Sequence, residues 1–114
     1  MHELGIIVHV SKTLEGIAVK NQLTEIQSVT LEIGEVSGIV PEFLTDCWNY
    51  YRKKNDILKE SELKIETLQA LTFCEDCEKK YLTVEHGKKC PYCGSDETYL
   101  VAGNECMIKE IEAC

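Results

Sequence analysis

Cysteines form the clearest chemical pattern in this sequence. Seven are present among 114 residues, and four of them form two C-x-x-C pairs, Cys74 with Cys77 and Cys90 with Cys93, separated by twelve residues. A C-x-x-C turn aims two thiolates at one metal ion, and two such turns placed face to face close a tetrahedron of four sulfurs. This ligand set suits zinc(II). The spacing therefore predicts a zinc site that folds about 30 residues too few to form an apolar core of their own.

Because all four positions are cysteine, no coordination position remains open for catalysis, and the zinc is expected to be structural. Two alternatives remain, an iron site of the rubredoxin kind and a pair of redox-active dithiols. The other three cysteines indicate no site. We expect Cys47 to lie in the core, Cys106 to pack within a strand and Cys114 to be a free thiol.

The first three residues, Met1-His2-Glu3, could bind a second metal ion. Histidine is bulky, so we expect the initiator methionine to be retained. The Met1 amine, the His2 amide nitrogen and the His2 imidazole could then chelate one ion in fused rings. A deprotonated amide is a strong-field ligand that favours square-planar nickel(II) or copper(II), and Glu3 could add its amide or its carboxylate. From these three residues alone, a frayed terminus is the simpler interpretation.

The other two histidines have weaker claims to a metal. His9 follows His2 by about two helical turns, roughly 10 Å of rise, which is too far to share one ion. We interpret His9 as a surface or helix-packing residue. His86 lies between the two cysteine pairs, and we interpret it as a solvated loop residue. Its alternative role is an extra ligand, if the cysteine module folds back toward the N-terminus.

Apolar periodicity predicts the elements that must position these groups. One helix is expected over residues 4–20, and a second begins at Pro41, a residue suited to the first helical turn. Alternation predicts strands over 28–36 and 62–70, a last strand over 105–112 with a bulge or change of face, and short strands at 81–84 and 98–101. The expected buried faces are Leu4, Ile7, Val8, Leu14, Ile17 and Ala18 in the first helix, and Phe43, Leu44, Cys47, Trp48 and Tyr51 in the second.

The order of these elements predicts an α+β fold, a small three-stranded sheet with two helices plus an inserted zinc-ribbon module. We divide the chain into an α+β domain, residues 1–71 with 102–114, and a zinc-ribbon domain, residues 72–101. The last strand follows the module, so exchange of that strand between two copies is conceivable. Both a monomer and a homodimer stay open.

Composition narrows the class of protein. Twelve lysine and arginine residues face twenty aspartate and glutamate residues, a net charge of -8. Non-specific nucleic-acid binding needs a basic face, so we expect no nucleic-acid partner. No apolar run approaches the roughly 20 residues that cross a membrane, and the first residues lack the pattern of a signal peptide, so we expect a cytoplasmic protein. No Ser–His–Asp set, glycine-rich phosphate loop or carboxylate pair stands out, and we expect no enzyme.

Taken together along the whole chain, these features resemble the hydrogenase maturation nickel chaperones, the HypA/HybF family. The resemblance rests on Met1-His2-Glu3-Leu4, Leu31-Glu32-Ile33-Gly34-Glu35-Val36-Ser37-Gly38, Pro41-Glu42, Cys74 to Cys77, Cys90-Pro91-Tyr92-Cys93-Gly94, Gly103-Asn104-Glu105, Ile108-Lys109 and Ile111-Glu112. Gly5 stands where serine is common, and Cys106 where leucine is common. Glu78 and Gly94 stand where some members carry a histidine implicated in metal-site switching, which argues against that switch here.

The resemblance implies a metallochaperone that carries nickel(II) as cargo for the maturation of nickel–iron hydrogenase. By the same resemblance, residues 1–71 with 102–114 form the nickel-binding domain, His2 is the essential nickel ligand with Met1 and Glu3 beside it, and the four cysteines hold zinc. The implied partners are a HypB-type GTPase and the hydrogenase large subunit, with urease maturation in some organisms.

An alternative from a different class is a zinc-ribbon adaptor that binds protein or RNA without carrying nickel. It would depend on the surface of the ribbon and be indifferent to His2. A third hypothesis is an iron-loaded electron carrier, which would be coloured and redox-active, whereas colourless protein with one zinc per chain would exclude it.

Overall fold

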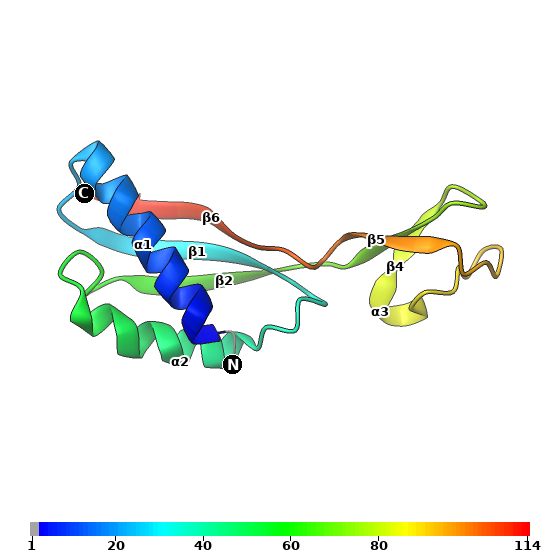
Figure 1. The fold of residues 1–114 in the computed structure, drawn as a ribbon, viewed down its shortest axis with the longest axis horizontal. Helices are drawn as coiled ribbons and strands as arrows, with labels where there is room; N and C mark the ends of the chain where they lie inside the picture. The colour runs from blue at the N-terminus through cyan, green and yellow to red at the C-terminus, as the bar shows by residue number, and fades with distance from the viewer. Residues whose placement is uncertain (1–2) are drawn as a thin grey trace. The chain divides into compact units, whose positions relative to one another are not determined.

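The computed structural model describes residues 3–114 of the chain (Figure 1). Its elements are α1 (Glu3–Asn21), β1 (Ile26–Gly34), α2 (Pro41–Tyr51), the 3-10 turn η1 (Arg52–Lys54), β2 (Glu62–Leu68), β3 (Leu71–Cys74), β4 (Lys80–Leu82), α3 (Thr83–His86), β5 (Thr98–Ala102) and β6 (Cys106–Ala113). They form two compact units. The first contains the described residues up to 32, with 39–66 and 107–114, and the second contains 33–38 and 67–106. The predicted α+β class with an inserted cysteine module is confirmed.

The first unit is built on a three-stranded sheet of order β2-β1-β6. Helix α1 crosses this sheet and packs against α2 (Figure 1). The Trp48 indole is fully buried, and its Nε1 donates a hydrogen bond to the Ser61 carbonyl at 3.0 Å. This unit therefore has a conventional apolar core, made by Ile7, Val10, Leu14 and Ala18 of α1, Val29 and Leu31 of β1, and Leu44 and Trp48 of α2.

Side chains from the two outer strands of this sheet meet across β1. Lys64 Nζ of β2 lies 3.1 Å from Glu112 Oε1 of β6, and Lys109 Nζ of β6 lies 2.6 Å from Glu66 Oε1 of β2. Ser28 of β1 donates its hydroxyl hydrogen to the same Glu112 oxygen at 2.5 Å. Ser28 is consequently buried although it carries a polar side chain, because these longer side chains cover it.

The second unit contains a smaller antiparallel sheet of order β4-β3-β5. Phe73 of β3 pairs with Tyr99 of β5, and their ring centroids lie 5.4 Å apart. The buried apolar cluster beside the cysteines is small: it consists of Cys74, Tyr81 and Cys90, with Cys77 packed against it. Three of these four residues are therefore predicted metal ligands.

Three segments of the second unit cross tightly near its connections to the first. Gly34 donates its N–H to the Glu105 carbonyl at 2.7 Å, and Val36 donates to the Gly103 carbonyl at 2.8 Å. A Cβ atom at Gly34 would lie 2.1 Å from the Gly103 carbonyl oxygen, and one at Gly103 would lie 2.4 Å from the Ala70 Cα. Gly103 also has a φ of +108°. Only glycine fits these two positions, so two motif glycines have a structural reason.

The predicted elements near the cysteines were partly wrong. The expected strand 81–84 ends at Leu82, because Thr83–His86 forms the short helix α3, which is followed by Gly87 at a φ of +63°. Strand β3 was not predicted, since its four residues are too short for alternation to be recognised.

Three positions predicted to be buried are exposed. Leu4 is 47% exposed and Phe43 is 55% exposed, whereas Val10 and Ser11 are buried on α1 in place of Leu4. Cys106 is exposed at the start of β6. Cys47 is half-buried, as are Val8, Ile17 and Tyr51. No helix among residues 3–114 is long and apolar enough to cross a bilayer.

Candidate metal sites

The first cysteine pair lies in the turn between β3 and β4. Cys74 ends β3, its N–H donates to the Lys79 carbonyl at 2.9 Å, and its carbonyl accepts from the Glu78 N–H at 2.8 Å. Glu78 has a φ of +59°, in the left-handed region that side chains other than glycine seldom adopt. These hydrogen bonds close a tight turn that directs Cys77 toward Cys74.

The second pair repeats this turn with the same spacing. The Cys90 N–H donates to the Ser95 carbonyl at 2.8 Å, and the Cys90 carbonyl accepts from the Gly94 N–H at 2.9 Å. Gly94 has a φ of +75° and corresponds to Glu78 in the first turn. In addition, the Tyr92 N–H donates to the Cys90 sulfur at 3.4 Å, as expected for a turn that prepares a thiolate for a cation.

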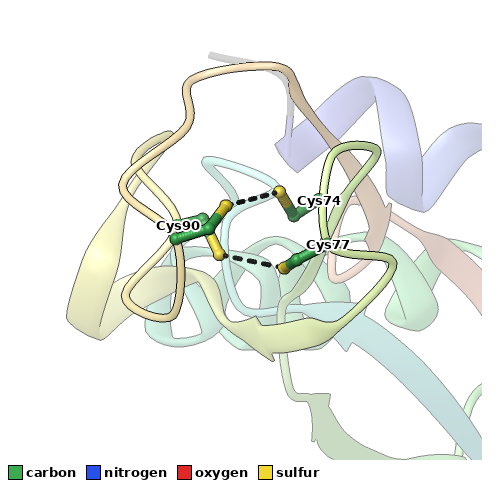
Figure 2. Close-up of side chains that lie close together, drawn as sticks. Cys74, Cys77 and Cys90 are labelled. Atoms are coloured by element: carbon green, nitrogen blue, oxygen red, sulfur yellow. Dashed lines mark hydrogen bonds between the residues drawn. The ribbon is translucent and has the colours of Figure 1, made fainter.

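The four cysteine sulfurs of the two turns converge on one point. Their Sγ atoms all lie within 4.8 Å of one another, with 3.6 Å between Cys74 and Cys93 and 3.6 Å between Cys77 and Cys90. Figure 2 shows the side chains of Cys74, Cys77 and Cys90 pointing toward one another. A tetrahedral zinc–thiolate site has sulfurs about 3.8 Å apart, so this donor set fits zinc. Among residues 3–114, no other group of three or more potential ligands is so close.

The protonation of the cluster also fits a bound cation. Burial acts to raise the pKa of Cys90, but the N–H donors of Cys93 and Tyr92 outweigh it and lower that pKa to about 7. The Ser95 N–H acts to lower the pKa of Cys93, but desolvation and the thiols of Cys74 and Cys90 raise it to about 12. The Cys90 thiolate therefore forms near neutral pH, whereas the Cys93 thiol keeps its proton there unless a bound cation displaces it.

The predicted terminal site can be described only from Glu3 onward, because Met1 and His2 lie outside the described residues. Glu3 begins α1, is 8% exposed, and its Oε2 accepts a hydrogen bond from the Val40 N–H at 3.3 Å. Val40 precedes Pro41, the first residue of α2, and has no side-chain cap of its own. The Glu3 carboxylate thus links the first turn of α1 to the first turn of α2. The positive end of the α2 dipole favours a negative charge at this position.

Sequence reasoning missed this contact between Glu3 and Val40. The two residues are separated by 37 positions, and the sequence carries no signal that brings them together. The Glu35 and Glu105 carboxylates of the motifs are likewise engaged with the backbone, accepting from the N–H groups of Ala70 and Gly103 at 2.9 and 2.6 Å.

The remaining histidines and cysteines are dispersed among the described residues. His9 is exposed on α1, as expected. His86 is exposed at the end of α3, where its ring and the Tyr81 ring lie edge to face with centroids 5.8 Å apart. Cys114 is exposed, and its sulfur accepts a hydrogen bond from Gln27 Nε2 at 3.2 Å. None of them joins the four-cysteine cluster.

The fold and the cluster define a small α+β protein with a four-cysteine metal module, and the family follows from comparison with known proteins. A family model described as "Hydrogenase/urease nickel incorporation, metallochaperone, hypA" matches residues 1–113. The chain therefore belongs to the HypA family of nickel-incorporation metallochaperones, which are maturation factors.

Individual relatives agree with this assignment, and a solved structure shares the fold. Hydrogenase maturation factor HypA of Geotalea uraniireducens is 32% identical over 112 residues, and that of Albidiferax ferrireducens is 30% identical over 112 residues, each match covering 98% of both chains. The solution structure of the nickel metallochaperone HypA from Helicobacter pylori shares the fold with a TM-score of 0.76 at 24% identity, over 99% of this chain and 97% of that one.

Proposed function

We propose that this protein binds nickel(II) at its N-terminus and delivers it for the maturation of nickel–iron hydrogenase. The observation that carries the proposal is the family match from residue 1 to residue 113, which includes Met1-His2-Glu3. The proposed donors are the Met1 amine, the His2 amide nitrogen and imidazole, and the Glu3 amide. The Glu3 carboxylate already accepts the Val40 N–H, which favours the amide of Glu3 as its contribution to the site.

Exchange of the cargo follows from the chemistry of these donors. The amine, the amide and the imidazole must each lose or lack a proton to bind nickel, so affinity falls as pH falls. All the proposed donors come from consecutive residues, so a recipient would take the ion from one short segment of the chain. The protein acts as a carrier and not as an enzyme.

Zinc is the proposed resident ion of Cys74, Cys77, Cys90 and Cys93, and the convergence of four sulfurs supports it. When bound, zinc would cross-link the two turns, and the four cysteines would leave it no open coordination position. We further propose that residues 1–71 with 102–114 form the nickel-binding domain and 72–101 the zinc-ribbon domain. The proposed setting is the cytoplasm. The proposed partner is a HypB-type GTPase and the proposed recipient is the hydrogenase large subunit, with urease maturation as a second pathway in organisms that have it.

A nickel titration of zinc-loaded protein, followed by calorimetry and by absorption in the d–d region, tests the terminal site. The proposal expects one equivalent of nickel, with binding weakened by His2→Ala and by one extra residue ahead of Met1. Sensitivity to His2→Ala alone would keep the carrier but remove the amine as a ligand. Unchanged binding in both variants, or no binding by the parent, would favour the zinc-ribbon adaptor that binds protein or RNA.

A further inference from the structure

An apolar hollow opens beside the start of α1. It has a volume of about 320 Å³ and is lined by Glu3, Leu4, Phe43, Asp46 and Cys47, and we call it the helix-start groove. Leu4 and Phe43 are 47% and 55% exposed, although the sequence pattern places both on apolar helix faces. Two large apolar side chains left exposed around one hollow are typical of a protein-binding surface.

A second hollow flanks α2 on its other side. It has a volume of about 390 Å³ and lies between α2 and β2, lined by Pro41, Glu42, Thr45, Asp46, Leu63 and Ile65. Asp46 therefore borders both hollows. The first two turns of α2 form a ridge between them, with Phe43 on the side of α1.

The two chain segments that line the helix-start groove carry charges of one sign. Residues 3–11 and 35–51 contain no lysine or arginine, and the nearest cations along the chain are Lys12 and Arg52. Glu42 and Asp46 are exposed carboxylates on the ridge. His9, exposed on α1, is the one titratable base within these two segments. An acidic partner would be repelled here, whereas a basic one is attracted and oriented.

We propose that the helix-start groove docks a partner protein that inserts an apolar side chain beside Phe43 and Leu4 and places a lysine or arginine against Glu42 or Asp46. The inference rests on the proposed function in one respect: it identifies this docked protein as the one that exchanges nickel. Glu3, which lines the groove, is adjacent in the chain to His2, and consecutive Cα atoms are about 3.8 Å apart. Docking in the groove brings a recipient next to the proposed cargo site.

Binding of the purified HypB-type GTPase of the same organism, measured by calorimetry with both proteins free of nickel, tests the surface. Phe43→Ala removes the exposed ring, and Tyr50→Ala is its matched control, since Tyr50 is 62% exposed on the same helix outside the groove. Asp46→Lys reverses the charge of the ridge, and Asp56→Lys is its matched control at an exposed position beyond α2. Thermal melts establish that all four variants are folded.

We expect Phe43→Ala and Asp46→Lys each to weaken binding at least tenfold and the two controls to bind within twofold of the parent. Parent-like binding by either groove variant overturns the proposal, as does equal weakening by a control or the absence of binding by the parent. Nickel affinity of the same four variants should equal that of the parent. A change caused by His2→Ala concerns the cargo site alone, so failure of the docking surface and failure of the nickel site are distinguished.

Discussion

The two units of this protein are stabilised in different ways. The first buries a tryptophan and a set of aliphatic side chains from two helices and a sheet. The second has Tyr81 and the cysteines themselves in its buried cluster. Burial of apolar area contributes about 25 cal/mol per Å². A cluster this small therefore cannot order residues 33–38 and 67–106 without another source of free energy. Zinc coordination, proposed for the four sulfurs, is of the required size.

This contrast also separates the two kinds of metal site that we propose. The four sulfurs come from two turns on either side of β4 and α3, so binding an ion there constrains much of the second unit. The terminal donors are consecutive residues, so binding an ion there constrains little. A resident ion therefore suits the first arrangement and a cargo ion suits the second.

The largest effect should come from removing zinc. A high-affinity chelator, or Cys90→Ser, should abolish amide protection throughout β3, β4 and β5, because binding energies of about 10–16 kcal/mol hold comparable zinc-dependent folds together. The first unit should remain folded. Its reporter is Trp48, the one tryptophan in the sequence, which is fully buried in that unit. Hydrogen exchange and tryptophan fluorescence would measure the two units separately.

The first unit should nevertheless become less stable in that experiment. Its strand β6 returns after residues 67–106, and an unfolded loop of this length costs a few kcal/mol to close. A midpoint of Trp48 unfolding that is unchanged by chelation would contradict this coupling. Cys114→Ser, which removes a thiol outside the cluster, is the matched control for Cys90→Ser.

The same contrast determines how far sequence reasoning could go. The helices and the strands of the first unit were recognised because Ile7, Leu14, Leu31 and Trp48 follow the periods of a helix and a strand through long segments. The cysteine cluster was recognised because the spacing of four side chains fixes its chemistry. In the second unit β3 and α3 have four residues each, too few for a period to appear.

The exposed groove was also beyond prediction from sequence. Leu4 and Phe43 have the helical spacing of buried residues, and the pattern cannot distinguish an apolar side chain in the core from one at an open surface. The contact of Glu3 with Val40 depends on how α1 packs against α2, which no local signal encodes.

A smaller effect distinguishes the two cysteine turns. They have the same hydrogen bonds, but the left-handed residue is Glu78 in the first and Gly94 in the second. A side chain in that conformation costs roughly 1 kcal/mol, so Glu78→Gly should stabilise the zinc-loaded second unit by about that amount. Gly94→Ala should destabilise it by a similar amount. Nothing lies within 4 Å of a Cβ at Gly94, so the effect would come from the backbone alone.

Hydrogen exchange of the amides in β3 would measure both changes, with Lys79→Gly as a control for simply adding a glycine to the first turn. Equal and opposite shifts would establish that the two turns are equivalent. A destabilising Glu78→Gly would mean instead that the Glu78 side chain contributes more than its backbone conformation costs.

The smallest effect should come from the polar face of the first unit, which neither the core nor a metal stabilises. The Ser28 hydroxyl and the Lys64 ammonium hold the pKa of Glu112 below its usual value. A lowered folded pKa contributes stability that is present above the unfolded pKa, about 4.5, and is lost as pH falls through the folded value. Glu112→Gln should therefore lower the unfolding temperature of the first unit by about 1–3 °C at pH 7, and by less as the solution is acidified.

Trp48 fluorescence would follow this unfolding transition, with Glu110→Gln, on the same strand, as the matched control. The opposite result would be a difference in unfolding temperature between Glu112→Gln and the parent that grows toward acid pH. It would mean that the Glu112 carboxylate destabilises this face. The ion pair with Lys64 would then have no part in holding β2 and β6 together across β1.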